Sequence, residues 1–450
     1  MTAPPTASLP PGPPWPRPVQ TLRWLVRPTA MMEELHRRYG DMFTVEIANE
    51  GTWIFLAHPD AVKQVFTGDP RLLHAGEANR ILLPLLGHHS VLLLDDGAHM
   101  RQRKLMLPPF HGERMRNYEE VMAEAARAEV DRWPLGQATA VRPATQRITL
   151  EIITRTVFGV QDERRRERLM ATLGHVLEWG GDPKRMAILA ALGPRHAATT
   201  RMFREVRRAS DELIYEEIRS RRAADDLGER EDVLSMLLQA RHEDGSPMTD
   251  EELRDELMTL LVAGHETTAS ALAWAVERLV RHPEALARLR EEADGGGTEY
   301  ADAVCKETLR LRPILSLVVR RLKEPMEIGG RLLPAGVTVA PCIYLVHRRP
   351  DVYPEPLAFR PERFLERPAG TYTWFPFGGG VRRCLGASFA LFEMRIVLQE
   401  LVKGLELRAA DPRPERFVRR AITNVPQRGG EVVAQRRAVR REGSPVAAAA

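Results

Sequence analysis

Cysteine is scarce in this sequence, and the few cysteines present do not form the pattern of a disulfide framework or a zinc site. The 450 residues contain three cysteines, Cys305, Cys342 and Cys384. An odd number in a long chain argues against a disulfide framework, and no pair has the C-x-x-C type of spacing that binds zinc. The sequence therefore predicts a reducing, cytoplasmic setting, and it leaves a single cysteine free for a special role.

The sequence also lacks the segments that would carry it to or across a membrane. No run of 18 uninterrupted apolar residues occurs, so no transmembrane anchor is expected. The first residues, MTAPPTASLPPGPPWPRP, hold no charged region followed by an apolar run, so they do not read as a signal peptide. Charge is nearly balanced as well: 65 Lys and Arg against 61 Asp and Glu give +4, too weak a bias for a nucleic-acid-binding protein.

Helical patterns dominate the chain up to Pro313, and short β-like runs follow, which together predict an α+β fold that is mainly α. At 450 residues the chain exceeds the ~250–300 residues at which one core stops growing, so two domains or one large composite domain are expected. The long stretch 249–281 opens with Thr249-Asp250-Glu251-Glu252, a good helix start. The predicted helices are 29–39, 58–66, 97–106, 114–133, 142–158, 162–178, 195–223, 231–241, 249–281, 283–293, 298–311 and 385–402.

A smaller β-rich part and two irregular ends complete this outline. A hairpin is predicted from 42–48 and 52–57, and strands from 317–321, 325–333 and 336–346. The irregular stretch 67–96 carries apolar clusters, and a loop of this length in a compact protein is typically functional. We expect residues 1–28 to form a stiff proline-rich segment, residues 29–428 the folded domain, and residues 429–450 a disordered arginine-rich tail.

The strongest local signal is a glycine-rich loop that ends in a cysteine, Phe377-Gly378-Gly379-Gly380-Val381-Arg382-Arg383-Cys384-Leu385-Gly386. Glycines let a loop wrap close to a flat, rigid object. Cys384 stands at the start of a predicted helix, where the helix dipole and the free N–H groups favour a thiolate, and Arg382 adds a positive charge. A thiolate is a soft, electron-donating ligand that suits haem iron. A lone cysteine in such a turn would more often be structural. The choice between a structural cysteine and a haem ligand therefore depends on the whole sequence pattern around it.

That pattern, F-x-x-G-x-R-x-C-x-G, resembles the haem-binding signature of the cytochromes P450, and the chain is similar to their soluble bacterial members from about residue 10 to 428. The resemblance implies the P450 fold, with a large helical body, a smaller β-rich part and a long central distal helix. It implies haem b as cofactor and Cys384 as the axial iron ligand. It further implies that Phe377 packs beside the sulfur, that Arg382 binds a haem propionate, and that Gly386 belongs to the cofactor site.

The long helix carries a second motif, Ala263-Gly264-His265-Glu266-Thr267-Thr268. A glycine in mid-helix costs about 1 kcal/mol relative to alanine. A threonine hydroxyl can bond back to the carbonyl four residues earlier, here that of Ala263, so the helix is expected to loosen and open a groove. A kinked core helix would look the same. By resemblance to the family's oxygen-binding motif, Ala263 and Gly264 contact the cofactor, Thr267 hydrogen-bonds at the dioxygen site, and Glu266 relays protons.

Two further motifs follow in the family's order. Glu307 and Arg310 lie three residues apart on one helix face, where such a pair alone is weak evidence. By resemblance they and Arg363 of the Pro361-Glu362-Arg363-Phe364 segment form a buried brace for the cysteine loop.

His99 and Arg103, at i and i+4 on one helix face, suit an anion, although a solvated basic face is the usual case. By resemblance they bind a haem propionate. Arg320 matches a third propionate-binding arginine, with Arg321 as the alternative register.

The resemblance implies insertion of one oxygen atom from O2 into a small molecule. Electrons would come from NAD(P)H through a separate ferredoxin or flavodoxin with its reductase, and we expect a monomer. An H2O2-driven peroxygenase is the first alternative, although such members lack the acid–threonine pair, and a non-catalytic haem-binding protein is the second. The predicted substrate pocket is apolar, which favours a terpenoid, steroid, fatty acid or polyketide. Its members are Leu260, Ala263, Ile314, Leu315, Leu317, Val318, Ala421 and Ile422.

Overall fold

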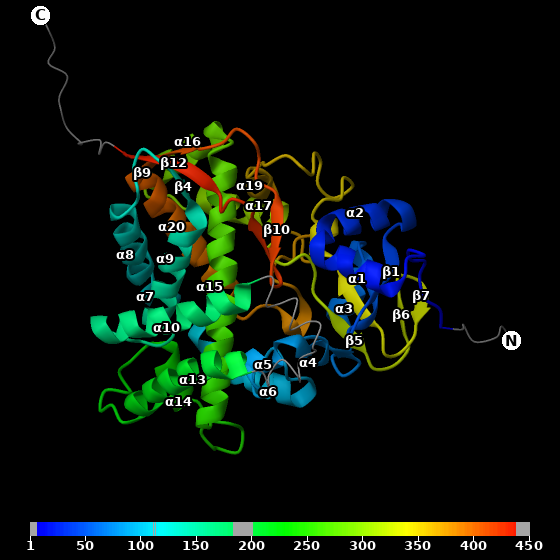
Figure 1. Cartoon of the computed structure of the whole chain (residues 1–450), viewed down its shortest axis with the longest axis horizontal. Coiled ribbons are helices and arrows are strands. Elements are labelled where there is room, and N and C mark those ends of the chain that lie inside the picture. The colour runs from blue at the N-terminus through cyan, green and yellow to red at the C-terminus, as the bar shows by residue number, and fades with distance from the viewer. Residues whose placement is uncertain (1–6, 111, 113, 183–200, 438–450) are drawn as a thin grey trace, which may run out of the picture.

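The computed structural model of the chain describes residues 7–110, 112, 114–182 and 201–437, and it confirms an α+β fold that is mainly α. A helical body surrounds one long helix, and a smaller β-rich part lies to one side with the N-terminal helices (Figure 1). Most predicted helices are present with ends shifted by a few residues; the first residues of the predicted 195–223 helix, 195–200, lie outside the described residues.

The central helix, α15 (Asp250–Leu279), runs through the body and is unbroken over its 30 residues. At 1.5 Å per residue it is about 45 Å long, so it crosses the molecule. It begins with the predicted capping box, because the Thr249 hydroxyl accepts from the Glu252 N–H and the Glu252 carboxylate accepts from the Thr249 N–H. The side chains of Trp274 and Leu272 are fully buried against its neighbours. The helix is therefore the axis on which the site is built.

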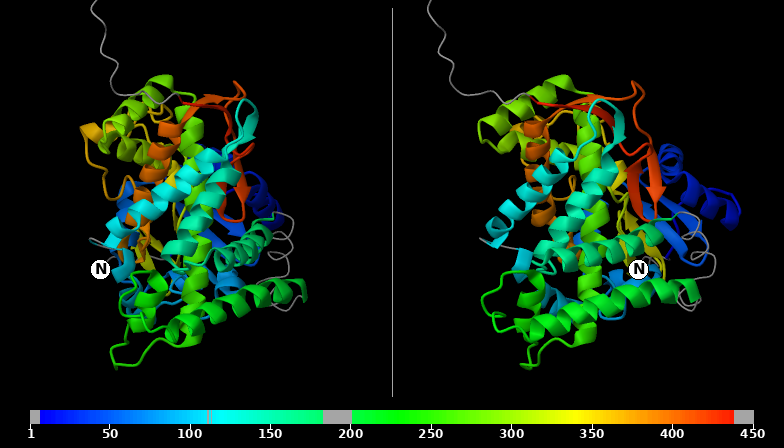
Figure 2. Two further views of the ribbon diagram at one scale, coloured as in Figure 1. Left: turned by 90° about the vertical axis from the view of Figure 1, so that its left-hand side faces the viewer. Right: turned by 60° about the vertical axis from the view of Figure 1, so that its left-hand side comes forward.

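The other helices pack around this axis, as the two views of Figure 2 show. Helix α9 (Val141–Thr156) crosses α15, and α20 (Ala387–Gly404) and α17 (Glu299–Leu311) pack on another side. Together they bury one continuous hydrophobic core. The remaining long helices are α6 (Asp96–Met106), α8 (Glu119–Asp131), α10 (Glu163–Gly181), α13 (Arg201–Arg222), α14 (Val233–Gln239) and α16 (Pro283–Asp294).

The β-rich part is built on a five-stranded sheet in the order β1-β2-β8-β5-β3. Strand β2 pairs with β1 antiparallel, as the predicted hairpin requires, and with β8 parallel. Helices α2 (Pro28–Tyr39) and α3 (Pro59–Thr67) lie beside it. The bounds are β1 (Met42–Ile47), β2 (Gly51–Leu56), β3 (Leu73–His74), β5 (Arg320–Leu322) and β8 (Thr338–Pro341).

The N-terminal segment corrects the expectation that residues 1–28 are a proline-rich segment outside the folded domain. Residues Arg17–Val26 form helix α1, with Pro16 before it and a proline in its first turn. Proline is well tolerated there because the first turn has no use for its N–H. Trp24 packs edge-on against Phe55 with ring centroids 5.5 Å apart. Residues 17–28 therefore belong to the folded body.

The C-terminal expectation was also wrong in part. Strand β12 (Glu431–Arg436) pairs with β9 (Leu405–Ala409) on one edge and with β4 (Ala138–Ala140) on the other. Val432 and Ala434 are fully buried and Val433 is 7% exposed, so the middle of this strand is part of the core. The arginine-rich composition of this region hid the strand. Residues 438–450 of the predicted tail lie outside the described residues.

Two β-like runs divide differently from the prediction. The 325–333 run is a hairpin of β6 (Met326–Ile328) and β7 (Arg331–Leu333). In the 336–346 run, strand β8 ends at Pro341, which has no N–H for a ladder, and the helical turn α18 (Ile343–Val346) follows.

The irregular stretch 67–96 contains short helical turns that carboxylates of the body hold in place. These turns are α4 (Ala75–Ala78) and α5 (Leu83–Leu86). On α15, Asp255 accepts from the His89 N–H at 2.9 Å, and Glu256 accepts from the Val91 N–H at 2.8 Å. The second oxygen of Glu256, Oε2, is buried without a hydrogen-bond partner, and burial raises the pKa of this carboxyl to about 8.

Because its pKa is raised, Glu256 should make the folded protein less stable as the pH rises, and Glu256→Gln should remove this dependence on pH. The unfolded chain ionises this group near its ordinary pKa of 4.5, whereas the folded protein keeps it neutral to about pH 8. Between these values the group lowers the free energy of unfolding by about 1.4 kcal/mol per pH unit as the pH rises. Urea denaturation from about pH 5 to pH 7 should give Glu256→Gln a flatter pH dependence than wild type. Glu251→Gln, at an exposed position of the same helix, is the control, and equal slopes in all three proteins would contradict the prediction.

Candidate active site

The cysteine loop lies between a long meander and α20. Its two ends are tied together, because the Cys384 N–H donates to the Phe377 carbonyl at 3.0 Å and the Arg383 N–H donates to that of Gly380 at 3.1 Å. Gly378 and Gly380 have φ of +67° and +65°, which only glycine adopts easily. Helix α20 begins at Ala387, so Cys384 precedes the helix by three residues.

Two glycines of this loop are needed for a contact that the sequence did not reveal. A Cβ at Gly379 would lie 2.2 Å from the Phe66 ring of α3, and a Cβ at Gly380 would lie 2.2 Å from the Phe66 carbonyl oxygen. These two glycines are therefore required for packing the loop against α3. At Gly386, in contrast, no atom lies within 4 Å of an added Cβ, so the loop faces open space there.

Cys384 is an exposed cysteine, whereas Cys305 and Cys342 are buried. The Cys384 thiol is nevertheless deep enough that burial raises its pKa, against the lowering effects of the Gly386 N–H and of the Arg103 and Arg383 charges. This direction is the opposite of the one expected from the helix start and from Arg382, because burial outweighs the groups that favour the thiolate. A bound metal cation would reverse the preference, because it favours the deprotonated thiol.

The middle of α15 also carries accessible surface. Ala263 is exposed and Thr267 is half-buried, although both lie at the centre of a helix whose neighbouring turns are buried. The Thr267 hydroxyl donates to the Ala263 carbonyl at 2.5 Å, as predicted, but the helix does not break. Accessible side chains at such a position mark an internal space.

Gly264 has a packing role that the sequence did not reveal. A Cβ at this position would lie 3.3 Å from the Ile153 Cδ1 atom of α9. The glycine therefore allows α9 and α15 to approach closely, and the expected groove does not come from a loosened helix.

Glu266 is held by side chains of α9. Its carboxylate accepts from Arg142 at 2.6 Å and from Gln146 at 3.0 Å, and the Ser270 hydroxyl lies 3.3 Å away. The neighbouring His265 also contacts α9, since its Nε2 lies 3.0 Å from the Gln146 carbonyl oxygen. Burial lowers the pKa of His265 to about 4. Arg142 and Gln146 were missed from the sequence because no motif links α9 to α15.

Four basic side chains from three separate segments face one another near the loop: His99, Arg103, Arg320 and Arg382. Burial and the charges of Arg382, Arg103 and Arg320 lower the pKa of His99 to about 3. Burial also lowers the pKa of Arg320 and of Arg382 to about 10 each. Buried positive charges repel one another and are poorly solvated, so this cluster favours an anionic ligand.

Asp95 is the acidic partner in this cluster, and the sequence analysis missed it. Arg382 donates to the Asp95 carboxylate and to the Leu94 carbonyl, both at 2.5 Å. Asp95 also accepts from the N–H groups of Gly76 and Glu77 at 2.8 Å. One aspartate thus joins the cysteine loop to the 67–96 stretch.

The register of the third arginine is settled by strand β5. Arg320 is buried with its side chain toward Arg382, and it donates to the Val319 carbonyl at 2.7 Å. Arg321 points the other way, as alternate strand residues do, and donates to the Glu50 carbonyl at 3.3 Å. Arg320 is therefore the member that joins the basic cluster.

The proposed brace residues meet in the core. Arg310 and Glu307 are fully buried and form a bidentate pair with N–O distances of 2.7 and 2.8 Å. Arg363 donates to Glu307 at 3.1 Å. Arg310 also donates to the carbonyls of His347, Pro356 and Ala358. The three charged side chains therefore attach α17 to the meander that precedes the cysteine loop.

Two further contacts carry this attachment to the loop itself. The His347 Nε2 accepts from the Phe375 N–H at 3.0 Å, and burial keeps the pKa of His347 well below its usual value, so that this nitrogen is free to accept. The Trp374 indole donates to the Lys306 carbonyl at 3.1 Å. His347 was not singled out in the sequence, because nothing local distinguishes it.

Comparison with known proteins agrees with this geometry. A sequence model of the family described as Cytochrome P450 matches residues 10–429. The chain belongs to the cytochrome P450 family. It is 44% identical to the putative cytochrome P450 135B1 of Mycobacterium bovis over 96% of this chain and 92% of that protein. It is 40% identical to the putative cytochrome P450 135A1 of Mycobacterium tuberculosis, covering 96% and 97%.

The fold of this cytochrome P450 also matches solved structures. The crystal structure of the cytochrome P450DA haem domain has a TM-score of 0.83, with 24% identity over 96% of this chain and 98% of that one. Retinoic acid-bound cyanobacterial CYP120A1 has a TM-score of 0.81, with 24% identity over 96% and 100%. Family membership makes the chain a haem-dependent, oxygen-incorporating monooxygenase of a family that needs redox partners.

The residues of this site fit a haem. An accessible thiol at Cys384 can serve as an iron ligand, the space beside Gly386 is open, and four basic groups stand where acidic propionates would relieve their mutual repulsion. A small hollow lined in part by Phe66, Arg320 and Arg382 lies at this basic end.

The eight pocket candidates pack against different hydrophobic clusters. Leu260 and Ile314 belong to the main core, and Leu315 and Val318 pack against the cluster of the five-stranded sheet. Leu317 packs instead against the N-terminal aromatic cluster. Ala421 and Ile422 lie at the turn between β10 (Phe417–Arg420) and β11 (Thr423–Pro426), where the Ile422 side chain is 44% exposed. Ala263 and Leu260 remain the pocket candidates on α15.

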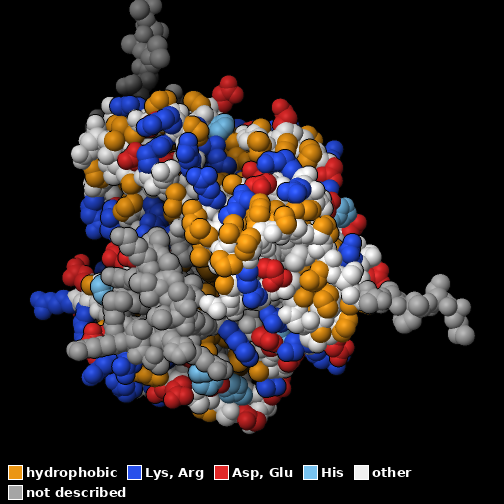
Figure 3. Space-filling view, turned by 45° about the vertical axis from the view of Figure 1, so that its right-hand side comes forward, with side chains coloured by type: hydrophobic (Ala, Val, Ile, Leu, Met, Phe, Trp, Pro, Cys, Tyr) orange, Lys and Arg blue, Asp and Glu red, His pale blue; other side chains and the backbone are white. Residues whose placement is uncertain are grey.

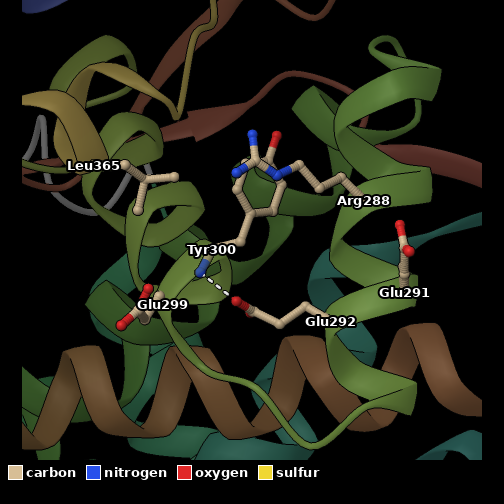
Figure 4. A pocket seen from close by; sticks show the side chains of 6 residues that line it. All are labelled: Arg288, Glu291, Glu292, Glu299, Tyr300 and Leu365. Atoms are coloured by element: carbon tan, nitrogen blue, oxygen red, sulfur yellow. Dashed lines mark hydrogen bonds between the residues drawn. The ribbon is translucent and has the colours of Figure 1, made fainter.

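A second hollow, of about 230 Å³, lies between α16 and α17 (Figure 4). Arg288 stacks over the Tyr300 ring at 4.2 Å, and the Tyr300 N–H donates to Glu292. None of its lining residues belongs to the site described above. Within the described ranges, no cluster of three or more His, Cys, Asp or Glu side chains could hold a metal ion, and no helix is long and apolar enough to span a membrane.

Proposed function

We propose that this cytochrome P450 inserts one oxygen atom from O2 into a lipophilic small molecule such as a terpenoid, steroid, fatty acid or polyketide. Electrons would come from NAD(P)H through a separate ferredoxin or flavodoxin and its reductase, in the cytoplasm, with the enzyme acting as a monomer. The observation that carries the proposal is the accessible surface of Cys384, Ala263 and Thr267 in an otherwise buried interior.

In this proposal each residue has a definite task. Cys384 would hold the iron of haem b through its sulfur, and His99, Arg103, Arg320 and Arg382 would bind the propionates. When bound, the haem supplies the activation of dioxygen, aided by electron donation from the thiolate. Phe377, which is half-buried against the core, would pack beside the sulfur. The contacts through Glu307, Arg310 and Arg363 keep the loop in position.

The chain's own groups would handle the protons. The Thr267 hydroxyl holds a proton at the accessible face of α15. The Glu266 carboxylate takes up a proton from solvent and passes it on toward that hydroxyl. Arg142 and Gln146 orient that carboxylate. A general acid works only within hydrogen-bond reach of the atom it serves, so the position of the hydroxyl matters as much as its acidity.

The apolar lining supports a lipophilic substrate. Leu82, Leu85, Leu92 and Leu93 from the 67–96 stretch are only partly buried although they pack against the main core. Burial of apolar ligand surface against such side chains is favourable. A screen of candidate compounds by absorbance, watching for the shift from low-spin to high-spin haem, would identify the class.

The exposed face of α6 and the exposed Arg383 support a docking site for an acidic electron carrier. Arg101 and Lys104 are exposed on α6, and Lys104 forms a loose surface pair with Glu243 at 3.4 Å. Such rim charges chiefly affect the rate of association and its dependence on salt.

Thr267→Ala should leave haem content nearly unchanged but lower the ratio of product formed to NADH consumed several-fold. The lost hydroxyl leaves proton delivery disordered, so reducing equivalents go to H2O2. The measurement needs NADH, a ferredoxin and its reductase. Thr267→Ser keeps the hydroxyl and is the matched control, with a ratio near that of wild type.

An unchanged ratio in Thr267→Ala would remove Thr267 from the proposed proton path. Product formed equally well from H2O2 without NADH would favour the peroxygenase alternative. Haem binding with no product under either condition would favour the non-catalytic alternative.

A further inference from the structure

Arg420, the last residue of β10, is a half-buried arginine whose guanidinium lacks an acceptor. Its Nε is buried without a hydrogen-bond partner, and no residue that the structure describes forms a hydrogen bond or an ion pair with this side chain. Elsewhere basic side chains are balanced locally: on the face shown in Figure 3 they lie among acidic ones. A charged donor that is buried without an acceptor costs free energy, so Arg420 requires a functional explanation.

The charges around Arg420 do not neutralise it fully. Burial, together with the charge of Arg142, lowers the pKa of Arg420, while the carboxylates of Glu266, Glu178 and Asp182 act in the opposite direction. The Glu266 carboxylate already accepts from Arg142 at 2.6 Å. Within the described ranges, neither Glu178, which is exposed, nor Asp182 forms an ion pair with Arg420. This group of side chains therefore favours one further anion.

The hairpin of β10 and β11 holds Arg420 in place. Ala421 at its tip has a φ of +52°, a conformation that residues other than glycine adopt at a cost. The Ala421 carbonyl accepts from the Arg419 Nε at 2.8 Å, and the Thr423 hydroxyl donates to the Arg420 carbonyl at 2.9 Å. Strained residues that are fixed in this way cluster at ligand sites.

The same hairpin lies between α15 and a predicted pocket residue. The Trp274 indole of α15 donates to the Asn424 carbonyl of β11 at 3.0 Å, and the Asn424 N–H donates to the Ile314 carbonyl at 2.8 Å. At the tip, the Ile422 side chain is 44% exposed. Accessible apolar surface therefore lies two positions along the chain from Arg420.

We propose that Arg420 binds the carboxylate of the substrate, which makes the substrate a lipophilic carboxylic acid such as a long-chain fatty acid. This inference rests on the proposed monooxygenase function and narrows its substrate class. A guanidinium offers paired N–H donors in one plane, which match the two oxygens of a carboxylate. The carboxylate would supply the acceptor that Arg420 lacks, and the apolar chain would extend past Ile422 toward the accessible surface of Ala263 and Thr267.

A neutral substrate fits Arg420 less well than an acid does. A steroid or terpenoid without an acidic group would leave the guanidinium without an acceptor in the complex as well, and would remove water from it. A role for Arg420 in holding Glu266 is also disfavoured, because Arg142 and Gln146 already hold that carboxylate and Arg420 forms no hydrogen bond with it.

Spectral titration of the purified haem-loaded enzyme with tetradecanoic acid and with tetradecanol tests this proposal. The acid should produce the shift from low-spin to high-spin haem with a Kd about tenfold or more below that of the alcohol, because only the acid forms the charged hydrogen bond. Arg420→Gln should raise the Kd of the acid to that of the alcohol and leave the Kd of the alcohol unchanged. Arg420→Lys, which keeps the charge but loses the planar donors, should keep part of the preference.

The matched control is Arg416→Gln, the same substitution at an exposed arginine four positions earlier, and it should bind both compounds as wild type does. An unchanged CO difference spectrum shows that each variant retains its haem site. Equal Kd values for acid and alcohol in wild type, or an acid preference that survives in Arg420→Gln, would overturn the proposal.

Calorimetry with the same two compounds separates this proposal from the function on which it rests. Binding of the acid that Arg420→Gln abolishes, without any spin shift, would support the anion site and contradict oxidation of such an acid at the haem. A spin shift with the alcohol alone would support oxidation of neutral molecules and overturn the anion site. Neither heat nor spin shift with the acid would overturn it as well.

Discussion

Cys384→Ser is expected to remove the red-shifted Soret band that marks thiolate ligation in the reduced, CO-bound protein. A serine hydroxyl donates far less electron density than a thiolate, so the band should be lost entirely and turnover with it. The measurement is the CO difference spectrum after reduction. The effect should be the largest of any single substitution on the activity of this enzyme.

The other two cysteines provide controls for this experiment. Cys305 and Cys342 are buried, and burial raises the pKa of both thiols far above the ordinary value. Buried thiols in apolar surroundings are inert. Cys305→Ser and Cys342→Ser should therefore keep the band. If the band survives in Cys384→Ser and disappears in either of the other variants, the ligand assignment is wrong.

Glu307→Ala should have the largest effect on folding. Removing this carboxylate leaves Arg310, which is fully buried, and Arg363 without their shared partner. An uncompensated buried charge costs about 3–5 kcal/mol, which is a large share of the stability of most domains. The variant should be recovered in low yield, or should lose haem, because the cysteine loop is attached through the same segment. Haem content per protein and the urea midpoint measure both effects.

An exposed ion pair on the same meander gives the control. Arg360 and Glu366 form a salt bridge, but their side chains are 45% and 51% exposed. Exposed pairs contribute at most about 1 kcal/mol. Glu366→Ala should therefore resemble wild type in both measurements. A soluble, fully haem-loaded Glu307→Ala protein would contradict the brace.

Much of the fold could be predicted, because helix periodicity and end signals are local. Helix α15 is the clearest case, since Thr249 and Glu252 form the capping box that their spacing predicts. Helix α1 and strand β12 were missed for the opposite reason. The prolines before α1 and in its first turn hid the helix that follows them, and the arginine-rich composition around β12 hid its buried segment Val432–Ala434.

The candidate site divides in the same way. The sequence by itself determined which chemical groups are present: one cysteine in a closed glycine loop, a threonine that bonds back along its helix, and charged residues at fixed helical spacing. Each of these depends on residues within about ten positions of one another.

Only the tertiary structure decided how these groups are partnered. Arg382 meets Asp95, 287 positions earlier, and Glu266 meets Arg142, 124 positions earlier. The same holds for Phe66 against Gly379 and for His347 against Phe375. The physical reason is that such contacts depend on how the helices and the sheet pack. A single sequence carries no local signal for a partner supplied by another element.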